Sequence, residues 1–348
     1  METSVTVVIP AYNATSTIDI CMKSLAAQQG FTGSVEVIVV DDCSTDETVK
    51  RLEYWREKLS GERFRLRILR QEKNQGPAAA RNRGAQEAVG DFVLFTDADC
   101  EADSHWLAEM IRPFEDPEVS AVKGAYKTRQ KELAARFCQA EFEDRYRLLD
   151  RHRYVDVVFS YSAGFRTRVF LDTGGYDPAF PVADNEDTDL SYRLATAGHR
   201  IVFNRKAIIY HHHPDTLGWY LRKKYSRAYW RMLVYKRYPE KAVADTYTPQ
   251  TLKLEILLAA VLLLSLLLSL WIPASLWVSA VAAAAFLVLG LSFVAKLEVP
   301  GWDLKLAAPF IMFARAVVMG AGLLAVIPRL LRKDSLQAQL ATDQDSQS

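Results

Sequence analysis

A long uncharged stretch dominates the C-terminal third of the chain. Forty consecutive residues, from Ile256 to Ala295, carry no charged side chain and are rich in Leu, Ala and Val. A helix needs about 20 apolar residues to cross the hydrocarbon core of a bilayer, so the stretch is long enough for two passes. Pro273, near its middle, suits the turn between them. The sequence therefore predicts membrane spans over residues 252–272 and 274–295.

A third apolar segment, residues 306–328, is compatible with two arrangements because it carries Arg315 near its centre. A lipid-facing arginine at that depth costs about 2.5–3.5 kcal/mol on insertion scales. If the segment spans, the basic residues after it lie outside, against the positive-inside rule. If it lies in the interface or re-enters, those residues stay inside.

Basic and aromatic residues alternate in the stretch before the first span. They are Arg222, Lys223, Lys224, Arg227, Arg231, Lys236, Arg237 and Lys241, with Trp219, Tyr220, Tyr225, Tyr229, Trp230 and Tyr235. This composition is typical of an interfacial helix on anionic headgroups, and it would also suit a single-stranded nucleic acid. Because the apolar stretch follows closely and the net charge of the chain is only +1, we favour the membrane and expect no nucleic-acid partner. The positive-inside rule then predicts a multi-pass protein of the inner or plasma membrane, with its N-terminal domain in the cytoplasm.

The first 215 residues have the pattern of a soluble α/β domain. Short β-branched runs such as Ser4–Pro10 and Val35–Asp41 alternate with stretches of helical periodicity. Such runs are typical of a mostly parallel sheet covered on both faces. The four cysteines show no CxxC spacing, which favours a reducing compartment. The predicted organisation is an α/β domain over 1–215, a basic and aromatic linker over 216–250, a membrane region over 251–331 and a polar tail over 332–348.

Polar residues gather where the predicted strands end, which is the usual ligand crevice of such sheets. The first strand runs into Pro10 and Tyr12 without the GxGxxG pattern of dinucleotide-binding enzymes, which excludes a dehydrogenase. The second strand ends in Asp41 and Asp42. Adjacent acids at a strand end can accept hydrogen bonds from a base and a ribose hydroxyl, or they can cap the next helix.

A second acidic motif, Asp97-Ala98-Asp99, follows the predicted strand Phe92–Thr96. Two carboxylates separated by one residue can converge on one hard divalent cation, which keeps water and diphosphate oxygens as its other ligands. Loop acids with this spacing also occur without a metal. The order of the surrounding motifs therefore decides the interpretation.

Six motifs occur in a fixed order: VVIPAYNA, VEVIVVDDCSTDET, NQGPAAARNRG, FTDADC, SAGFRTRVFLDTGGYD and NEDTDLSYRL. Together they resemble the inverting family 2 glycosyltransferases of GT-A fold, over residues 4–215. The resemblance implies an α/β, Rossmann-like and mostly parallel sheet that binds a nucleotide-diphospho-sugar, with Mg²⁺ or Mn²⁺ as cofactor. The C-terminal apolar hairpin resembles that of members acting on membrane-linked acceptors.

The resemblance also implies a donor site along the strand ends. The residues that would surround the nucleotide-sugar are Pro10, Tyr12, Asp41, Asp42, Gly76, Arg81 and Asp97. Asp99 would ligate the cation. A departing nucleoside diphosphate carries concentrated negative charge that a bound cation stabilises, so the leaving oxygen needs no acid catalyst.

The remaining requirement is a base for the acceptor hydroxyl on the opposite face of the sugar. Asn185-Glu186-Asp187 opens a predicted helix, whose N-terminal dipole favours ionised carboxylates. In the family pattern the second acid is usually the base, so the resemblance implies Asp187, with Glu186 as the alternative. Acids at this position also serve as ordinary helix caps.

Two further pairs of residues are candidates for the site. His211 and His213 would share one face of an extended strand, and family members often place a histidine here near the metal or the diphosphate. Gly164 and Gly175 suit an acceptor-side wall, where missing side chains let a sugar approach the backbone, or ordinary turns.

These features predict an inverting glycosyltransferase that moves one sugar from a nucleotide-sugar to a glycan acceptor, lipid-linked, in glycan or exopolysaccharide assembly. Residues 225–230 lack the QxxRW motif of processive members, which favours single-sugar transfer. One alternative is a polyprenyl-phosphate sugar transferase, whose ionised acceptor hardly needs Asp187. Another is a catalytically silent sugar-binding scaffold of a membrane assembly complex.

Overall fold

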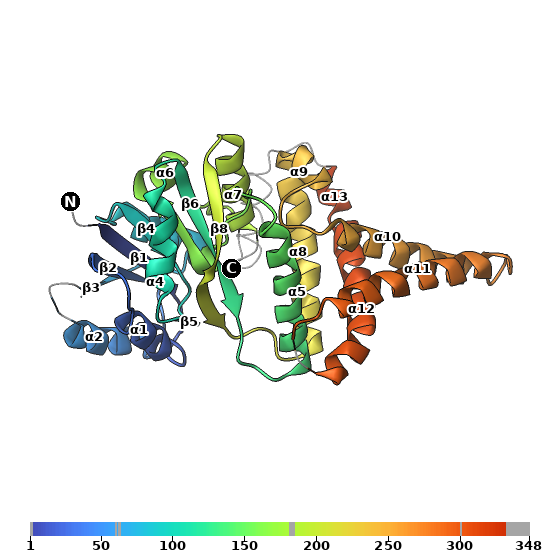
Figure 1. Cartoon of the computed structure of the whole chain (residues 1–348), viewed down its shortest axis with the longest axis horizontal. Helices are drawn as coiled ribbons and strands as arrows, with labels where there is room; N and C mark the ends of the chain where they lie inside the picture. Colours follow the sequence, from blue (N-terminus) through green and yellow to red (C-terminus); the bar gives the residue numbers. More distant parts are fainter. Residues whose placement is uncertain (1–2, 60, 62–63, 181–184, 300, 332–348) are drawn as a thin grey trace. The chain divides into compact units, whose positions relative to one another are not determined.

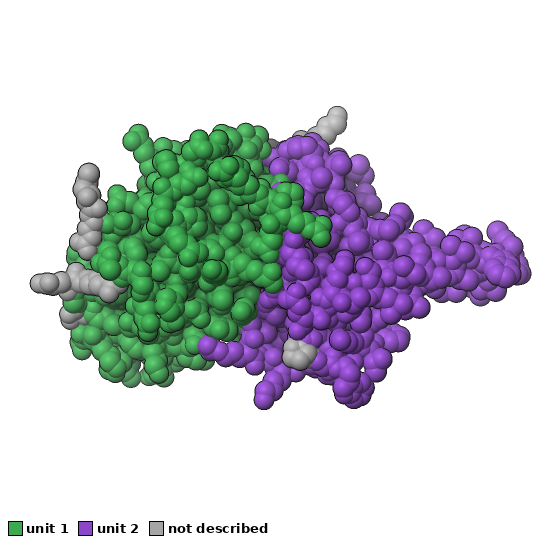
Figure 2. Space-filling model, in the orientation of Figure 1, with its two compact units in different colours: residues 1–127, 149–212, 335–348 green, residues 128–148, 213–334 purple. Residues whose placement is uncertain are grey.

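The computed structural model describes residues 3–59, 61, 64–180, 185–299 and 301–331. The polar tail predicted over 332–348 lies outside the described residues. The chain forms two compact units (Figure 2). We call the described residues of 1–127 and 149–212 the sheet unit, and those of 128–148 and 213–331 the helical unit.

A single mixed sheet of eight strands forms the core of the sheet unit, in the order β3-β2-β1-β4-β7-β6-β8-β5. Its first four strands run parallel: β1 (Ser4–Ala11), β2 (Ser34–Asp41), β3 (Phe64–Arg70) and β4 (Phe92–Phe95). Almost every residue of β1 and β2 is buried, which explains their continuous apolar sequences. Both strands end at the same edge, where Ala11 pairs with Asp41.

Antiparallel pairing enters in the other half of the sheet. β7 (Ala163–Arg166) runs antiparallel to β4 and to β6 (Val119–Lys127), and β6 runs parallel to β8 (Arg200–His211). β5 (Cys100–Ala102) pairs antiparallel with the end of β8, so that Cys100 lies opposite His211. The predicted parallel character therefore holds for β1 to β4. β5 and β7 are only three and four residues long, too short to show a periodic pattern in the sequence.

Helices cover the sheet (Figure 1). They are α1 (Ile18–Ala26), α2 (Thr48–Lys58), α3 (Gly76–Gln86), α4 (Trp106–Ile111), α6 (Thr167–Asp172) and α7 (Glu186–Thr196), with short 3-10 turns at Arg112–Glu115 and Ser160–Ser162. α3 packs on β1 and β2. A Cβ at Gly84 would lie 2.3 Å from Val8 Cγ1, so glycine is needed for α3 to approach β1 this closely. The same packing fixes Arg81, three residues earlier on α3.

The helical unit contains seven helices in the part of the chain that the structure describes. They are α5 (Leu133–Leu149), α8 (Leu217–Arg237), α9 (Pro239–Val243), α10 (Gln250–Leu268), α11 (Ser275–Ala295), α12 (Trp302–Ala325) and α13 (Ile327–Leu330). α10 and α11 form a hairpin that turns around Pro273, and Ser265 Oγ lies 2.8 Å from Ser279 Oγ across it. Among the described residues, three helices are long and apolar enough to cross a membrane: α10, α11 and the segment that begins with α12.

Candidate functional site

The loops that follow β1 and β2 hold each other by hydrogen bonds. Asn13 has a left-handed backbone (φ 48°), its N–H donates to Ser44 Oγ (2.9 Å), and its Oδ1 accepts from the Thr45 N–H (2.9 Å). The Asp41 carboxylate is fully buried and accepts from the Ser44 N–H (3.3 Å). Tyr12, directly before Asn13, is about half exposed. An ordered loop pair thus presents the Tyr12 ring to solvent.

Asp42 organises the loop between β3 and α3. Its carboxylate oxygens accept hydrogen bonds from the backbone N–H groups of Gln75 and Gly76 (both 2.8 Å) and from Gln71 Nε2 (2.6 Å). Gly76 opens α3 with φ 83°, and no other heavy atom lies within 4 Å of the position that a Cβ would take. The Asp42 side chain therefore supports a loop whose backbone has space beside it.

Arg81 of α3 lies buried between two acidic segments. Its guanidinium donates to Asp97 Oδ1 (2.6 Å) and to Glu186 Oε1 (3.2 Å), and it lies 5.6 Å from the centre of the Tyr176 ring. Burial alone would lower the pKa of Arg81, but the two carboxylates outweigh it and raise that pKa above its ordinary value. One permanently charged side chain thus joins the end of β4 to the start of α7.

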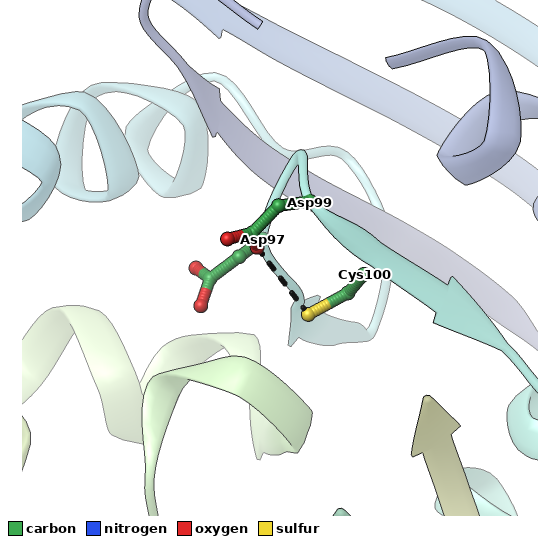
Figure 3. A group of neighbouring side chains, drawn as sticks. All are labelled: Asp97, Asp99 and Cys100. Atoms are coloured by element: carbon green, nitrogen blue, oxygen red, sulfur yellow. Dashed lines mark hydrogen bonds between the residues drawn. The ribbon is translucent and has the colours of Figure 1, made fainter. Parts of the chain in front are cut away.

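The turn between β4 and β5 brings Asp97, Asp99 and Cys100 together (Figure 3). One ligand atom from each residue lies within 4.8 Å of the others. Because β5 pairs with the end of β8, His211 Nε2 also lies near, 3.7 Å from Asp99 Oδ2. The Asp99 side chain is 52% exposed, so the group opens to solvent on the side of Asp99.

The chemistry of this group fits a hard divalent cation. Carboxylate oxygens from Asp97 and Asp99 are ligands that Mg²⁺ and Mn²⁺ prefer, and the nearby imidazole of His211 suits the transition metal Mn²⁺ better than Mg²⁺. Cys100 is different, because burial and the neighbouring carboxylates raise the pKa of its thiol well above the ordinary value. A thiolate is also a soft ligand, whereas Mg²⁺ and Mn²⁺ prefer oxygen ligands, so we leave Cys100 out of the ligand set. We call Asp97, Asp99 and His211 the candidate cation site.

Asp187 lies in the first turn of α7 beside two other acids, Glu186 and Asp189. The helix dipole stabilises ionised carboxylates at this position. Glu186 and Asp189 are buried and form ion pairs, Glu186 with Arg81 and Asp189 with Arg193. Asp187 is partly exposed. Of these three acids, Asp187 is therefore the one that is accessible to a ligand from solvent.

A row of side chains behind His211 has no motif in the sequence. The Tyr126 ring packs on the His211 imidazole (centroids 4.6 Å apart), and Tyr161 stacks on Tyr126 (3.4 Å, 13° between planes). Fully buried Lys123 donates from Nζ to Tyr161 Oη (2.7 Å). Burial lowers the pKa of Lys123 to about 7, although the negative charge of Asp187 acts to raise it. The one signal in the sequence is a lysine inside an otherwise apolar strand.

Gly164 and Gly175 have different surroundings. A Cβ at Gly164, in β7, would lie 2.7 Å from Leu94 Cδ2, so packing of the core requires glycine there. Gly175 has φ 65°, in a turn that Asn82 of α3 clasps. The Asn82 side chain accepts from the Tyr176 N–H (2.9 Å) and donates to the Tyr176 carbonyl (2.7 Å). The acceptor-side role of both glycines stays a prediction. The structure gives each glycine another reason to be there: tight packing at Gly164 and a turn with positive φ at Gly175.

His213 belongs to the helical unit. Its Nε2 lies 3.0 Å from Gln139 Oε1, and its ring stacks on Phe142 with centroids 5.4 Å apart. β8 ends at His211, so the alternation of a strand does not extend to residue 213. We therefore include only His211 in the candidate cation site.

Most of the predicted site residues lie in the sheet unit. Arg81 contacts Asp97 and Glu186, and these are close neighbours in sequence of Asp99 and Asp187. At the ends of two adjacent strands, β1 and β2, lie Pro10, Tyr12, Asp41 and Asp42. The arrangement can bind a cation at one acidic segment and hold a second carboxylate, Asp187, on the segment that Arg81 ties to it.

Two family models match the chain. The one described as glycosyl transferase family 2 matches residues 6–172. The one described as glycosyl transferase family group 2 matches residues 92–296, more than half of the chain.

Curated relatives match in sequence. The pre-mycofactocin glycosyltransferase of Mycobacterium tuberculosis is 30% identical over 230 residues, 64% of this chain and 45% of that protein. The poly(ribitol-phosphate) beta-N-acetylglucosaminyltransferase TarS of Staphylococcus aureus is 42% identical over 94 residues, 27% of this chain and 16% of that protein. The chain thus spans less than half the length of either relative.

A solved structure matches in fold. The mannosyltransferase PcManGT from Pyrobaculum calidifontis, in complex with GDP-Man and Mn²⁺, aligns with a TM-score of 0.58 at 22% identity, over 92% of this chain and 86% of that one. This likeness shows the GT-A fold, and the two family models show that the chain belongs to the family 2 glycosyltransferases.

Proposed function

We propose that the protein is a cation-assisted, inverting glycosyltransferase that transfers one sugar from a nucleotide-sugar to an acceptor hydroxyl. The observation that carries the proposal is the buried Arg81 guanidinium, bonded to both Asp97 and Glu186. It ties the acidic end of β4 to the first turn of α7. A donor diphosphate at the first segment and an acceptor hydroxyl at the second would then meet at one sugar carbon.

Asp187 is the proposed base. As the acceptor oxygen attacks the anomeric carbon, its proton passes to the Asp187 carboxylate, and the bond from that carbon to the diphosphate oxygen breaks on the opposite face. A single in-line displacement of this kind inverts the configuration. Glu186 is buried against Arg81 and would position the segment instead of taking the proton.

Asp97, Asp99 and His211 would hold Mg²⁺ or Mn²⁺. Such a cation, when bound, neutralises negative charge on the departing nucleoside diphosphate. The donor set and the exposure of Asp99 support this assignment. The structural neighbour PcManGT, solved with GDP-Man and Mn²⁺, has the same fold.

The donor nucleotide would bind along the ends of β1 and β2. Tyr12 offers an exposed ring for the base, with Pro10 and Asp41 beside it, and Gly76 offers an open stretch of backbone. The N–H groups of Gln75 and Gly76 are bound to Asp42, so this loop offers a donor the open space beside Gly76. A nucleoside diphosphate sugar is the class of donor that these groups support.

The acceptor is proposed to be a lipid-linked glycan intermediate in glycan or exopolysaccharide assembly. The α10–α11 hairpin would anchor the protein in the inner or plasma membrane, and the sheet unit would face the cytoplasm. The apolar length of the hairpin and the basic α8 before it support this proposal.

Membranes containing the protein, incubated with Mn²⁺ and a panel of labelled nucleotide-sugars, test the proposal. One donor is expected to yield lipid-extractable label, and EDTA to abolish it. Asp99→Ala is expected to lower the rate at least about 10²–10³-fold, the loss seen when one electrostatic group is removed from a site. Glu101→Ala, which removes another acid two residues away in β5, is the matched control and should stay active. Silence across the panel would contradict the proposal and favour the sugar-binding scaffold.

A further inference from the structure

α12 runs along α8 in the helical unit (Figure 1). A Cβ at Gly322 would lie 2.7 Å from the Tyr225 carbonyl oxygen and 3.3 Å from Ala228 Cβ, so the two backbones are in close contact. Further along α8, the guanidinium of Arg329, in α13 directly after α12, lies 5.3 Å from the centre of the Trp230 ring. The contacts advance in the same direction on both helices, which therefore lie side by side.

The last turns continue this contact. Lys236 Nζ, at the end of α8, donates to the carbonyl of Leu330, the last residue of α13 (3.1 Å). From residue 225 to residue 236 the paired stretch of α8 is about 16 Å long at 1.5 Å per residue. This stretch pairs with the last turn of α12 and with α13, and α12 itself packs on α8 (Figure 1), so we place α12 at the same depth as α8.

The composition of α8 keeps this helix out of the hydrocarbon. Its 21 residues include Arg222, Lys223, Lys224, Arg227, Arg231, Lys236 and Arg237. Each charged residue at the bilayer centre costs about 2.5–3.5 kcal/mol on insertion scales. A helix with basic and aromatic residues of this density is suited to the headgroup region. Since α12 lies beside α8, α12 belongs to the same layer.

Arg315, in the middle of α12, is bound to groups at that layer. Its guanidinium donates to Glu141 of α5 and to Glu255 of α10, and all three side chains are buried. Glu141 also accepts from Lys224 Nζ and Tyr220 Oη of α8 (both 2.8 Å). Glu255 lies within the first two turns of α10. The arginine therefore marks the end of α10 where the hairpin begins, far from its turn.

Other contacts of α12 with the hairpin lie at its base or near its middle, where the Phe313 ring packs on Phe286 of α11 (centroids 5.5 Å apart). Gly290 of α11 meets Pro309, and Ile256 of α10 meets Gly320. Trp271, at the turn of the hairpin, is 72% exposed. Figure 1 shows α12 crossing the base of the hairpin instead of running along it.

One face of α12 offers large apolar side chains. Trp302, Leu306 and Phe310 follow one another at intervals of four residues, and each is more than 60% exposed. Side chains at this spacing lie on the same side of a helix. They suit the boundary between headgroups and acyl chains, where amphipathic helices bury one face.

We infer that α12 lies in the plane of the membrane surface beside α8, with Trp302, Leu306 and Phe310 in the boundary between headgroups and acyl chains, and that only the α10–α11 hairpin crosses the bilayer. The inference rests on the membrane attachment proposed above. It selects one of the two arrangements that the sequence allows for residues 306–328. Both ends of the chain then lie on the same side of the membrane.

Topology reporters on the full chain test the inference in bacterial cells. Alkaline phosphatase, which is active only outside the cytoplasm, and a fluorescent protein that folds inside it are fused before Met1, after Ser348, or between Ile272 and Pro273. The two terminal fusions are expected to be fluorescent without phosphatase activity, and the fusion at the hairpin turn to show phosphatase activity. An alkaline carbonate wash of the membranes, which removes peripheral proteins, measures attachment separately.

Each outcome decides a different statement. A C-terminal fusion active as phosphatase, with an N-terminal fusion that is fluorescent, means that the segment spans and overturns the inference while attachment stands. A turn fusion on the same side as both ends overturns the crossing of the hairpin. A chain released by carbonate overturns the attachment itself, and the in-plane arrangement with it. A single cysteine added after Ser348, in a chain whose four native cysteines are replaced, repeats the test with an impermeant maleimide, so a fusion that does not fold leaves the question answerable.

Discussion

The sheet unit and the helical unit each bury a group of charged side chains, and the two groups are built in opposite ways. In the sheet unit a cation, Arg81, lies between two carboxylates, Asp97 and Glu186. In the helical unit an anion, Glu141, lies among cations that include Lys224. Burial alone would raise the pKa of Glu141, but the surrounding cations outweigh it and hold that pKa well below its usual range.

The groups also differ in their access to solvent. Around Arg81 the Asp97 side chain is 27% exposed, and Asp99, two residues on, is more exposed still. Around Glu141 the side chains of Lys224, Arg315 and Glu255 are each at most 8% exposed. An open group can orient residues that meet a ligand, whereas a closed group can only join the helices that contribute to it. Under the proposed function we therefore assign the first group to the chemistry, and the second to the attachment of α5, α8, α10 and α12 to one another.

The largest expected effect separates chemistry from stability in the sheet unit. Asp187→Asn keeps the size of the side chain but removes the base, so kcat should fall by about 10²–10⁴-fold. The free energy of unfolding should change little, because Asp187 is partly exposed. Asp189→Asn, in the same helix turn, is the matched control: it breaks the ion pair with Arg193 and should affect stability more than kcat.

The same variant distinguishes two classes of acceptor. A polyprenyl-phosphate acceptor is already ionised and needs no base. Retention of full turnover by Asp187→Asn would therefore remove Asp187 from its proposed role and favour transfer to a phosphate. The measurement is the rate of sugar transfer at saturating donor and Mn²⁺.

The second effect belongs to the helical unit. Glu141→Gln leaves Arg315 and Lys224 buried without their common partner, and breaking a buried ion pair costs about 3–5 kcal/mol. The free energy of unfolding in detergent should fall by that amount, while KM for the donor in the folded fraction stays unchanged. A fall in donor affinity with normal stability would contradict the division between the two groups.

A combined replacement sharpens this test. Arg145 also pairs with Glu141, so the replacement includes it: Glu141, Arg145, Lys224, Glu255 and Arg315 are all exchanged for apolar residues of similar size, which removes every member of this group of ion pairs. Such replacements are often neutral. The combined variant should therefore be more stable than Glu141→Gln alone, as measured by the same denaturant titration.

A smaller effect is expected in the row behind His211. Tyr126→Leu removes the ring that packs on the imidazole, and loss of a group that orients a ligand typically lowers metal affinity about 10–100-fold. The Mn²⁺ dissociation constant, measured by electron paramagnetic resonance, should rise accordingly. Tyr54→Leu, at an exposed tyrosine of the same unit, is the control and should leave it unchanged. If Tyr126→Leu and Tyr54→Leu bound Mn²⁺ with equal affinity, the Tyr126 ring would have no role in cation binding.

The smallest effect is a dependence on pH. Burial lowers the pKa of Lys123 to about 7 from an ordinary value of 10.5, so between these values the unfolded chain binds more protons than the folded one. The free energy of unfolding should therefore rise with pH, by about 1.4 kcal/mol from pH 7.5 to 8.5, and Lys123→Met should lack this contribution. Burial also lowers the pKa of Lys224, to about 8. Its contribution to the rise in the free energy of unfolding therefore begins about one pH unit higher than that of Lys123. If the free energy of unfolding changed with pH in the same way in the wild type and in Lys123→Met, the dependence on pH would not come from Lys123.

The parts of the fold that the sequence predicts are those with local patterns. β1 and β2 are buried, β-branched runs, each predicted with seven residues, and the ends of β2 and β4 carry Asp41 and Asp97 within recognisable pairs of acids. The turn at Pro273 follows from one proline inside an uncharged stretch. In each case the determining residues are neighbours in the chain.

The parts that the sequence misses depend on contacts between distant residues. Arg315 is paired with Glu141 and Glu255, which are 174 and 60 residues away, so its environment has no local signal. His211 and His213 look equivalent in the sequence, but β8 ends between them. The contacts among Lys123, Tyr161 and Tyr126 likewise depend on how β6 meets the 3-10 turn that contains Tyr161.

Asp42 has a consequence for recognition at the loop that it supports. Because its carboxylate already accepts from the N–H groups of Gln75 and Gly76, folding of the protein fixes the backbone there before any ligand arrives. A phosphate or sugar that binds beside Gly76 then has no loop to order, and the conformational entropy lost on association is smaller. The loop is preorganised, and Asp42 would influence affinity by keeping it so.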